Sequence, residues 1–218
     1  MHKNIINLID IQKEIKLKKN NQNFNPKIVA VSKTFPINDI LPLIEYGHED
    51  FGENKVQEAL EKWKNIKIKN KSIKLHMVGK LQTNKVKQAV KLFDYIHSLD
   101  SIKLAEKISI EQKKINRNLS IFIQINIANE PQKSGIKIDD LENFYKICKE
   151  ELKLNIIGFM CLPPADIDPS EYFKSMQMFT EKFKLKELSM GMSSDYLMAI
   201  KFNTSFLRIG SKIFGNRN

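Results

Sequence analysis

The sequence predicts a (β/α)8 barrel, in which eight parallel strands alternate with helices around a closed sheet. Eight short apolar runs alternate with longer amphipathic stretches at a spacing of roughly 25 residues, which is typical of repeated βα units. The run IVAVS at 28–32 is continuous and β-branched, as in a parallel strand covered on both faces. The turn after it, SKTFP, has no glycine, so it lacks the phosphate-binding turn of an open, doubly wound sheet, which stays the alternative fold.

The elements follow one another in a regular order, and each has its own signal. The run at 120–127 is the strongest strand pattern, and Asp168-Pro169 gives a helix an N-cap followed by proline at its first position. The predicted strands are 28–32, 48–52, 75–78, 95–98, 120–127, 156–160, 187–190 and 205–209. The predicted helices are 37–46, 54–64, 85–93, 102–116, 139–152, 169–184 and 195–201. A further helix at 4–19 precedes the first strand and is expected to cover the outside or one end of the barrel.

The composition suits one globular domain over residues 1–218, of which 42% are hydrophobic. The net charge of +11 comes from 36 basic residues, of which only Arg117, Arg208 and Arg217 are arginine, leaving 33 lysines. These lysines are spread along the chain, and arginine is the residue preferred for bidentate recognition of phosphates and bases. We therefore expect a solvated basic surface, with the run 62–74 on an exposed helix end and loop, and no nucleic-acid partner.

Cysteine usage and hydropathy indicate a cytoplasmic protein. Cys148 and Cys161 form no C-x-x-C or Cys/His cluster, so we expect two reduced core thiols, no disulfide and no metal site. No segment approaches the roughly 20 apolar residues that cross a bilayer, and the N-terminus has no signal-peptide core. We expect no membrane association.

Polar residues gather after the predicted strands, where barrels of this class carry their sites. Lys33 ends an apolar strand, and desolvation of its amine would favour the neutral, nucleophilic form that adds to aldehydes. Hydroxyl and backbone N–H groups follow strands seven and eight, the usual phosphate position in this fold, at Ser193, Ser194, Gly210 and Ser211. The combination predicts a cradle for a phosphorylated aldehyde.

Three residues inside predicted strands have open readings. Arg208 is a charged residue in a strand, so it contacts either a ligand or a carboxylate in a structural salt bridge. His76 is either a satisfied core histidine or a ring-stacking or ligand residue. Asn126 either faces a ligand or makes a hydrogen bond inside the barrel.

Seven motifs at these residues resemble those of the pyridoxal phosphate homeostasis protein family, also called the YggS-like family. They run in order over nearly the whole chain from residue 28: AVSKTFP (30–36), FGENKVQE (51–58), LHMVGKLQTNK (75–85), QINIANEPQKSGI (124–136), GFMCLPP (158–164), LSMGMSSDYLMAI (188–200) and LRIGSKIFGNR (207–217). The resemblance implies a fold like the N-terminal barrel of alanine racemase. It also implies that pyridoxal 5′-phosphate (PLP) is bound as a Schiff base on Lys33, in a monomeric protein.

The resemblance further assigns roles by motif position. Ser193, Ser194, Gly210 and Ser211 would bind the phosphate, and Arg208 would face the pyridine nitrogen. Asn54 and His76 would line the ring, with Met190 and Met192 bordering the cofactor. The chain departs from the family pattern at Lys80, where proline is usual, and at 202–204, where a Gly-Ser or Gly-Thr turn is usual. Both departures are expected near the mouth of the barrel and put local loop shape in doubt.

The expected function is a PLP carrier or regulator without robust catalysis. An arginine at the pyridine nitrogen keeps that nitrogen unprotonated, which weakens PLP as an electron sink. Racemases of this arrangement take a second acid/base from another domain, for which 218 residues leave no room. PLP-dependent enzymes lacking their cofactor are the possible recipients. A PLP-dependent racemase or lyase is the alternative, and a nucleic-acid or protein-interaction module is the third reading.

Overall fold

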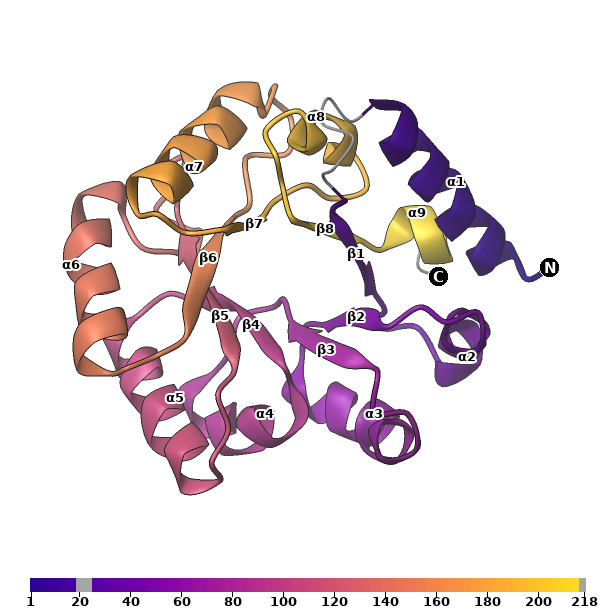
Figure 1. The fold of residues 1–218 in the computed structure, drawn as a ribbon, viewed down its shortest axis with the longest axis horizontal. Coiled ribbons are helices and arrows are strands. Elements are labelled where there is room, and N and C mark those ends of the chain that lie inside the picture. Colours follow the sequence, from indigo (N-terminus) through magenta and orange to yellow (C-terminus); the bar gives the residue numbers. More distant parts are fainter. Residues whose placement is uncertain (19–24, 216–218) are drawn as a thin grey trace.

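The computed structural model describes residues 1–18 and 25–215 and shows the predicted closed barrel of eight parallel strands (Figure 1). Each strand pairs with the next along the chain, and the last pairs with the first, with Val29 opposite Arg208. All eight predicted strands are confirmed, with bounds shifted by one or two residues. They are β1 (Lys27–Val31), β2 (Asp50–Glu53), β3 (Lys74–Met77), β4 (Tyr95–Leu99), β5 (Ser120–Ile125), β6 (Ile156–Cys161), β7 (Glu187–Ser189) and β8 (Phe206–Ile209).

Helices surround the barrel, as predicted. They are α1 (Lys3–Lys18), α2 (Ile37–Glu45), α3 (Val56–Lys69), α4 (Val86–Leu92), α5 (Ile102–Lys114), α6 (Leu141–Lys146), α7 (Ser170–Lys182), α8 (Tyr196–Ile200) and α9 (Ser211–Phe214). The short turns η1 (Thr83–Lys85) and η2 (Ile138–Asp140) precede α4 and α6, and the π-helical turn η3 (Ile147–Glu151) extends α6. The sequence did not predict α9.

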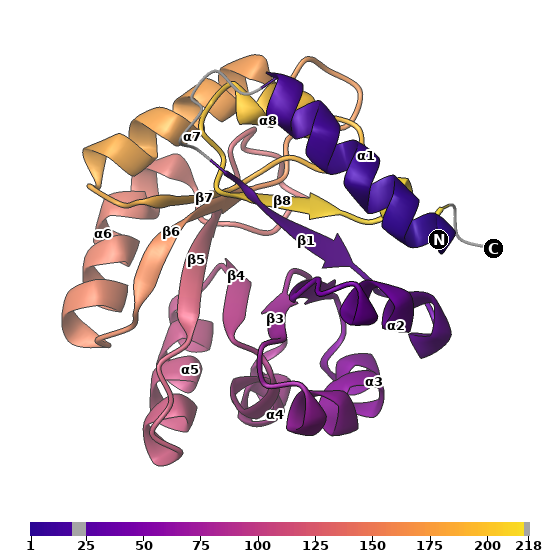
Figure 2. The ribbon, with the colours of Figure 1, turned by 45° about the vertical axis from the view of Figure 1, so that its right-hand side comes forward.

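The N-terminal helix α1 covers the outside of the barrel beside β1 and β8, packing on α2, α8 and α9 (Figure 2). Its Asn7 side chain donates a hydrogen bond to the Ile213 carbonyl in α9, and Glu14 accepts from Lys212 and Tyr196. These hydrogen bonds attach α8 and α9, near the end of the chain, to the N-terminal helix α1. Residue 19, the predicted end of this helix, and Arg217 lie outside the described residues.

Two apolar layers form the core. The larger one lies between strands and helices and includes Trp63, which is fully buried. The smaller one fills the barrel interior with Val29, Phe122, Met160 and Phe206. Alternate residues of each strand point to these two layers, so the strand period decides which side chains can reach a site inside the barrel.

Part of the lysine run 62–74 is not the exposed surface that the sequence predicted. The Lys62 side chain is only 9% exposed and its ammonium lies 2.9 Å from the buried Glu53 carboxylate, and Lys67 pairs with Asp94. The Trp63 indole N–H donates to the same Glu53 oxygen. These lysines were misassigned because the sequence does not reveal which carboxylates the barrel brings to them.

Both cysteines are buried and free, as predicted. Burial raises the pKa of each thiol to about 12. Among residues 1–18 and 25–215, no group of histidines, cysteines and carboxylates could hold a metal ion. No helix in the same ranges is both long and apolar enough to span a membrane.

Candidate functional site

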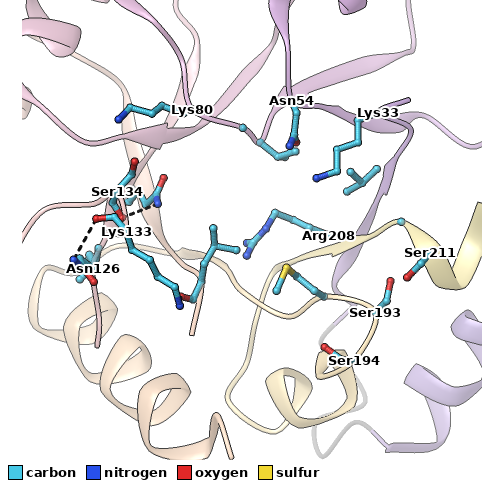
Figure 3. Close-up of a pocket in the computed structure, with 18 of the residues that line it drawn as sticks. Lys33, Asn54, Lys80, Asn126, Lys133, Ser134, Ser193, Ser194, Arg208 and Ser211 are labelled. Carbon is cyan, nitrogen blue, oxygen red and sulfur yellow. Dashed lines mark hydrogen bonds between the residues drawn. The ribbon is translucent and has the colours of Figure 1, made fainter. Parts of the chain in front are cut away.

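A cavity of about 870 Å³ opens at the C-terminal end of the barrel, among the loops that follow the strands (Figure 3). Its lining comes from β1, β5 and β8 and from the segments that follow β1, β2, β3, β5, β6, β7 and β8, so the cavity exists only in the closed barrel. Eight of the ten predicted site residues line it: Lys33, Asn54, Met192, Ser193, Ser194, Arg208, Gly210 and Ser211.

Lys33 follows β1 in a turn whose backbone is held in an unusual conformation. The next residue, Thr34, has φ of 67°, a region that β-branched residues rarely adopt and that costs about 1–3 kcal/mol. Its backbone N–H donates to the Glu58 carboxylate at 2.6 Å, which fixes the turn from outside. On the other side, the Ser32 hydroxyl donates to buried Glu53 at 2.8 Å. The lysine backbone is therefore anchored on both sides while the side chain points into the cavity (Figure 3).

Arg208 forms the floor of the cavity and is 5% exposed. Its position in β8 directs it inward, where Nη1 donates to Ser189 Oγ and Nη2 donates to the Cys161 carbonyl at 2.8 Å. Both acceptors are neutral, which does not fit a structural salt bridge. The other reading of the sequence, an arginine that faces a ligand, is the one that this geometry favours.

The segment after β7 forms a wall of hydroxyl groups next to Arg208. Gly191 turns the chain there with φ of +91°, and a Cβ on it would lie 2.7 Å from the Ala199 side chain. The Asp195 carboxylate then accepts the Met192 backbone N–H at 2.6 Å. As a result Ser193, Ser194 and Ser211 lie close to one another on the same side of the cavity (Figure 3).

The opposite side of the cavity contains residues that the sequence analysis did not assign to the site. Lys80 follows β3, and Lys133 and Ser134 belong to the loop after β5 (Figure 3). Asn126 shapes this loop: its amide nitrogen donates to the Glu130 carbonyl at 2.8 Å, and its amide oxygen accepts the Glu130 N–H. Position after a strand was the available signal for these residues, but a long loop leaves their direction open.

His76 and Met190 were predicted to border the cofactor, and the structure places both outside the cavity lining. His76 points into the barrel one layer below the cavity, while Val78, two residues further along the chain, lines it. The imidazole contacts Asp50 and His97 and stacks on Tyr95, which fits the reading of a satisfied core histidine.

Met190 is fully buried in the layer between strands and helices. The preceding residue, Ser189, points into the barrel interior and contacts Arg208. Neighbouring residues on a strand point to opposite faces, so Met190 faces the helices.

The two departures from the family pattern lie at opposite ends of the barrel. Lys80 lines the cavity, as expected. Asn203 instead precedes β8, at the end remote from the cavity, so its predicted place near the mouth is wrong. Its φ of 56° is a left-handed conformation that asparagine tolerates almost as glycine does, which keeps the turn intact.

The donors in this cavity fit the chemistry of PLP. A primary amine can bond to the aldehyde carbon, a guanidinium can donate to the pyridine nitrogen, and clustered hydroxyls can donate to a phosphate. The cavity volume lies within the usual range for sites that hold small organic molecules.

Comparisons with known proteins agree with this geometry. The family model described as "Alanine racemase, N-terminal domain" matches residues 6–218. The pyridoxal phosphate homeostasis protein of Haemophilus influenzae is 36% identical over 98% of this chain and 94% of its own length. The protein of the same name from Escherichia coli K12 is 31% identical over 88% of this chain and 86% of its own length.

Solved structures show the same architecture. The structure of PipY from Synechococcus elongatus with PLP bound has a TM-score of 0.86 and 28% identity, covering 97% of this chain and all of that one. Alanine racemase from Clostridium difficile 630 has a TM-score of 0.75 at 13% identity, and the match covers 99% of this chain and 57% of that enzyme. This similarity shows the shared fold. The chain thus belongs to the alanine racemase N-terminal domain family and, within it, to the pyridoxal phosphate homeostasis proteins.

Proposed function

We propose that this chain binds PLP in the cavity, as a Schiff base with Lys33, and takes part in PLP homeostasis by holding and releasing the cofactor. The observation that carries the proposal is that Lys33, Arg208 and the hydroxyl wall face one cavity (Figure 3). The relatives named pyridoxal phosphate homeostasis proteins and the PLP-bound PipY structure support it.

Each lining residue would have a distinct task. The Lys33 amine would bond to the aldehyde carbon with loss of water. Ser193, Ser194, Ser211 and the backbone at Gly210 would donate to the phosphate, because they share one wall. Arg208 would donate to the pyridine nitrogen, and Asn54 and Met192 would border the ring.

The described lining of the cavity favours binding over turnover. Its ionisable side chains are lysines and one arginine, and within the described residues no histidine, tyrosine or carboxylate lines it. When PLP is bound, its ring supplies an electron sink, but Arg208 cannot give up a proton to the pyridine nitrogen and so weakens that sink. We propose that a cytoplasmic, monomeric protein of this kind exchanges PLP with PLP-dependent apo-enzymes.

Covalent trapping tests the binding proposal. PLP should give an absorption band near the visible edge, and borohydride reduction followed by peptide mass spectrometry should place the label on Lys33. Lys33→Ala should lose both signals, while Lys80→Ala, which removes another cavity lysine, should keep them. Label on other lysines with none on Lys33 would contradict the proposal.

Amino-acid racemisation is a second candidate function, which one observation favours. Lys80 and Lys133 lie across the cavity from Lys33, where a second base would stand (Figure 3). Chiral chromatography of small amino acids incubated with the PLP-loaded protein distinguishes the two. Turnover at ordinary enzyme rates, on the order of 10 s⁻¹, would replace the carrier role.

A further inference from the structure

A chain of polar side chains runs through the barrel interior beneath the cavity. Barrels of this class usually fill that space with bulky branched apolar residues. Here His76, His97 and Ser189 are fully buried in it, and each is 0% exposed. They lie among the rings of Tyr95, Phe122 and Phe206. Polar groups left unpaired in such surroundings would cost about 1–3 kcal/mol each, so their partners matter.

Four hydrogen bonds connect these residues to both ends of the barrel. Asp50, the first residue of β2, has Oδ1 2.9 Å from His76 Nε2. His76 Nδ1 lies 3.0 Å from His97 Nε2, and His97 Nδ1 lies 2.8 Å from Ser189 Oγ. Arg208 Nη1, on the cavity floor, lies 2.5 Å from the same Ser189 oxygen. We call this set, from Asp50 to Arg208, the interior chain.

The two ends of the interior chain fix the direction of every hydrogen bond in it. A guanidinium only donates and an ionised carboxylate only accepts, while a neutral imidazole donates from one nitrogen and accepts at the other. Arg208 therefore donates to Ser189, Ser189 to His97, His97 to His76, and His76 to Asp50. Both imidazoles then carry their proton on Nε2. The reverse direction would set a bare His76 nitrogen against the Asp50 carboxylate.

The electrostatic surroundings agree with neutral imidazoles between charged ends. Burial lowers the pKa of His76, although Asp50 opposes the effect, and burial together with His76 and Arg208 lowers that of His97 well below 6.5. Burial alone would raise the pKa of Asp50, but the His76 hydrogen bond and Lys27 bring it below its ordinary value.

We propose that Ser189, His97, His76 and Asp50 are positioning residues for Arg208, holding its guanidinium in one orientation so that its N–H groups meet the ring nitrogen of bound PLP. The inference rests on the proposed function, because it assumes PLP on Lys33. The two groups that accept hydrogen bonds from Arg208, Ser189 Oγ and the Cys161 carbonyl, are both neutral. The interior chain gives this cation an anionic counterpart at the other end of the barrel.

The histidine tautomers of the unsubstituted protein test the geometry, and variants serve only to assign the signals. In ¹⁵N NMR spectra of the full chain, with and without PLP, His76 and His97 should both be neutral with the proton on Nε2. Assignment would use the spectra of single histidine variants. A proton on Nδ1 of either ring, or a charged ring at neutral pH, would overturn the proposed direction.

Binding measurements test the effect on the site. Ser189→Ala should weaken PLP binding about tenfold and shift the absorption band of the bound cofactor, because Arg208 loses one fixed contact. Asp50→Asn keeps an acceptor for His76 but removes the charge, so it should weaken PLP binding less than Ser189→Ala does. Ser189→Thr, which keeps the hydroxyl, should restore most of the affinity and the band position.

Two matched variants remove similar groups away from the interior chain. Ser109→Ala deletes a buried hydroxyl that donates to the Leu152 carbonyl, and Glu111→Gln changes a carboxylate that pairs with Lys107 and Lys114. Both should bind PLP as the wild type does, although each loses a partner for a hydrogen bond or ion pair and should be somewhat less stable to heat.

Each result has one meaning. If the wild type does not bind PLP, the proposed function fails. If the wild type binds PLP on Lys33 and Ser189→Ala and Asp50→Asn bind it equally well, the inference fails while the proposed function stands. Equal weakening in all four variants would also overturn it, because general destabilisation would explain the effect. If a variant does not fold, the wild-type tautomers decide.

Discussion

Mild acid should destabilise this protein, because His76 and His97 are buried in the barrel interior as neutral rings. Both are 0% exposed, and burial lowers the pKa of each, that of His97 well below 6.5. For His76, the Asp50 and Asp94 carboxylates oppose this effect and Lys27 adds to it. For His97, the positive charge of Arg208 and interaction with His76 add to it.

The sign follows from proton binding in the two states. In the unfolded chain each histidine takes up a proton as the pH falls through 6.5, whereas the buried ring does not. The unfolded state therefore binds more protons, and the free energy of unfolding falls below about pH 6.5. A ring that stays neutral in the folded protein lowers the free energy of unfolding by about 1.4 kcal/mol at one pH unit below its pKa in the unfolded chain. His97 should contribute this full loss and His76 a part of it. The free energy of unfolding should therefore fall by about 2 kcal/mol between about pH 7.5 and about pH 5.5.

Urea unfolding followed through the fluorescence of Trp63 measures this loss, since it is the single tryptophan and is fully buried. His97→Gln removes one titrating ring and should lose about 1.4 kcal/mol less on acidification. His2→Gln, at an exposed position, should keep the full pH dependence. A free energy of unfolding that changes by less than roughly 0.5 kcal/mol over this range would refute the reasoning.

Three further changes have outcomes that the structure determines. Gly191→Ala places a methyl group 2.7 Å from the Ala199 side chain at a φ of +91°, so it should lower the free energy of unfolding by about 2–4 kcal/mol and the melting temperature by roughly 5–15 °C. It should also weaken PLP binding. Calorimetry and PLP titration check this, and an unchanged melting temperature would contradict it. Lys62→Met leaves the buried Glu53 carboxylate without its cation and should cost about 3 kcal/mol in urea unfolding, whereas Lys13→Met, which breaks an exposed pair, should have little effect. Neither cysteine should react with an aromatic disulfide reagent near pH 8 in the folded protein, since burial raises both thiol pKa values to about 12; rapid reaction before unfolding would show that the interior opens.

The position of the site could be predicted from sequence because parallel strands bring their C-terminal ends together. Once the βα rhythm predicts a closed barrel, residues after the strands must share one end of it, however far apart they are in the chain. Lys33, Arg208 and the serines follow or end different strands, and they line one cavity in the structure. The βα rhythm assigned a place to each residue but no direction to its side chain.

The depth of a residue inside the barrel could not be predicted in the same way. His76 and Val78 both point inward, but two residues along a strand span about 6.6 Å, enough to separate the cavity from the layer below it. For Met190, the face of the sheet could not be predicted, since a shift of one residue moves a side chain to the opposite face. Motif position alone gave both residues a role at the cofactor.

The sequence by itself determined the eight βα units, the family and the lysine that is proposed to hold PLP, because these depend on local patterns and on the order of motifs along the chain. Only the tertiary structure decided which carboxylates partner the lysines of α3, and that Asp50, His76, His97 and Ser189 form a connected path to Arg208. Such contacts join strands that are distant in sequence. Their register, and so their partners, is fixed only when the barrel closes.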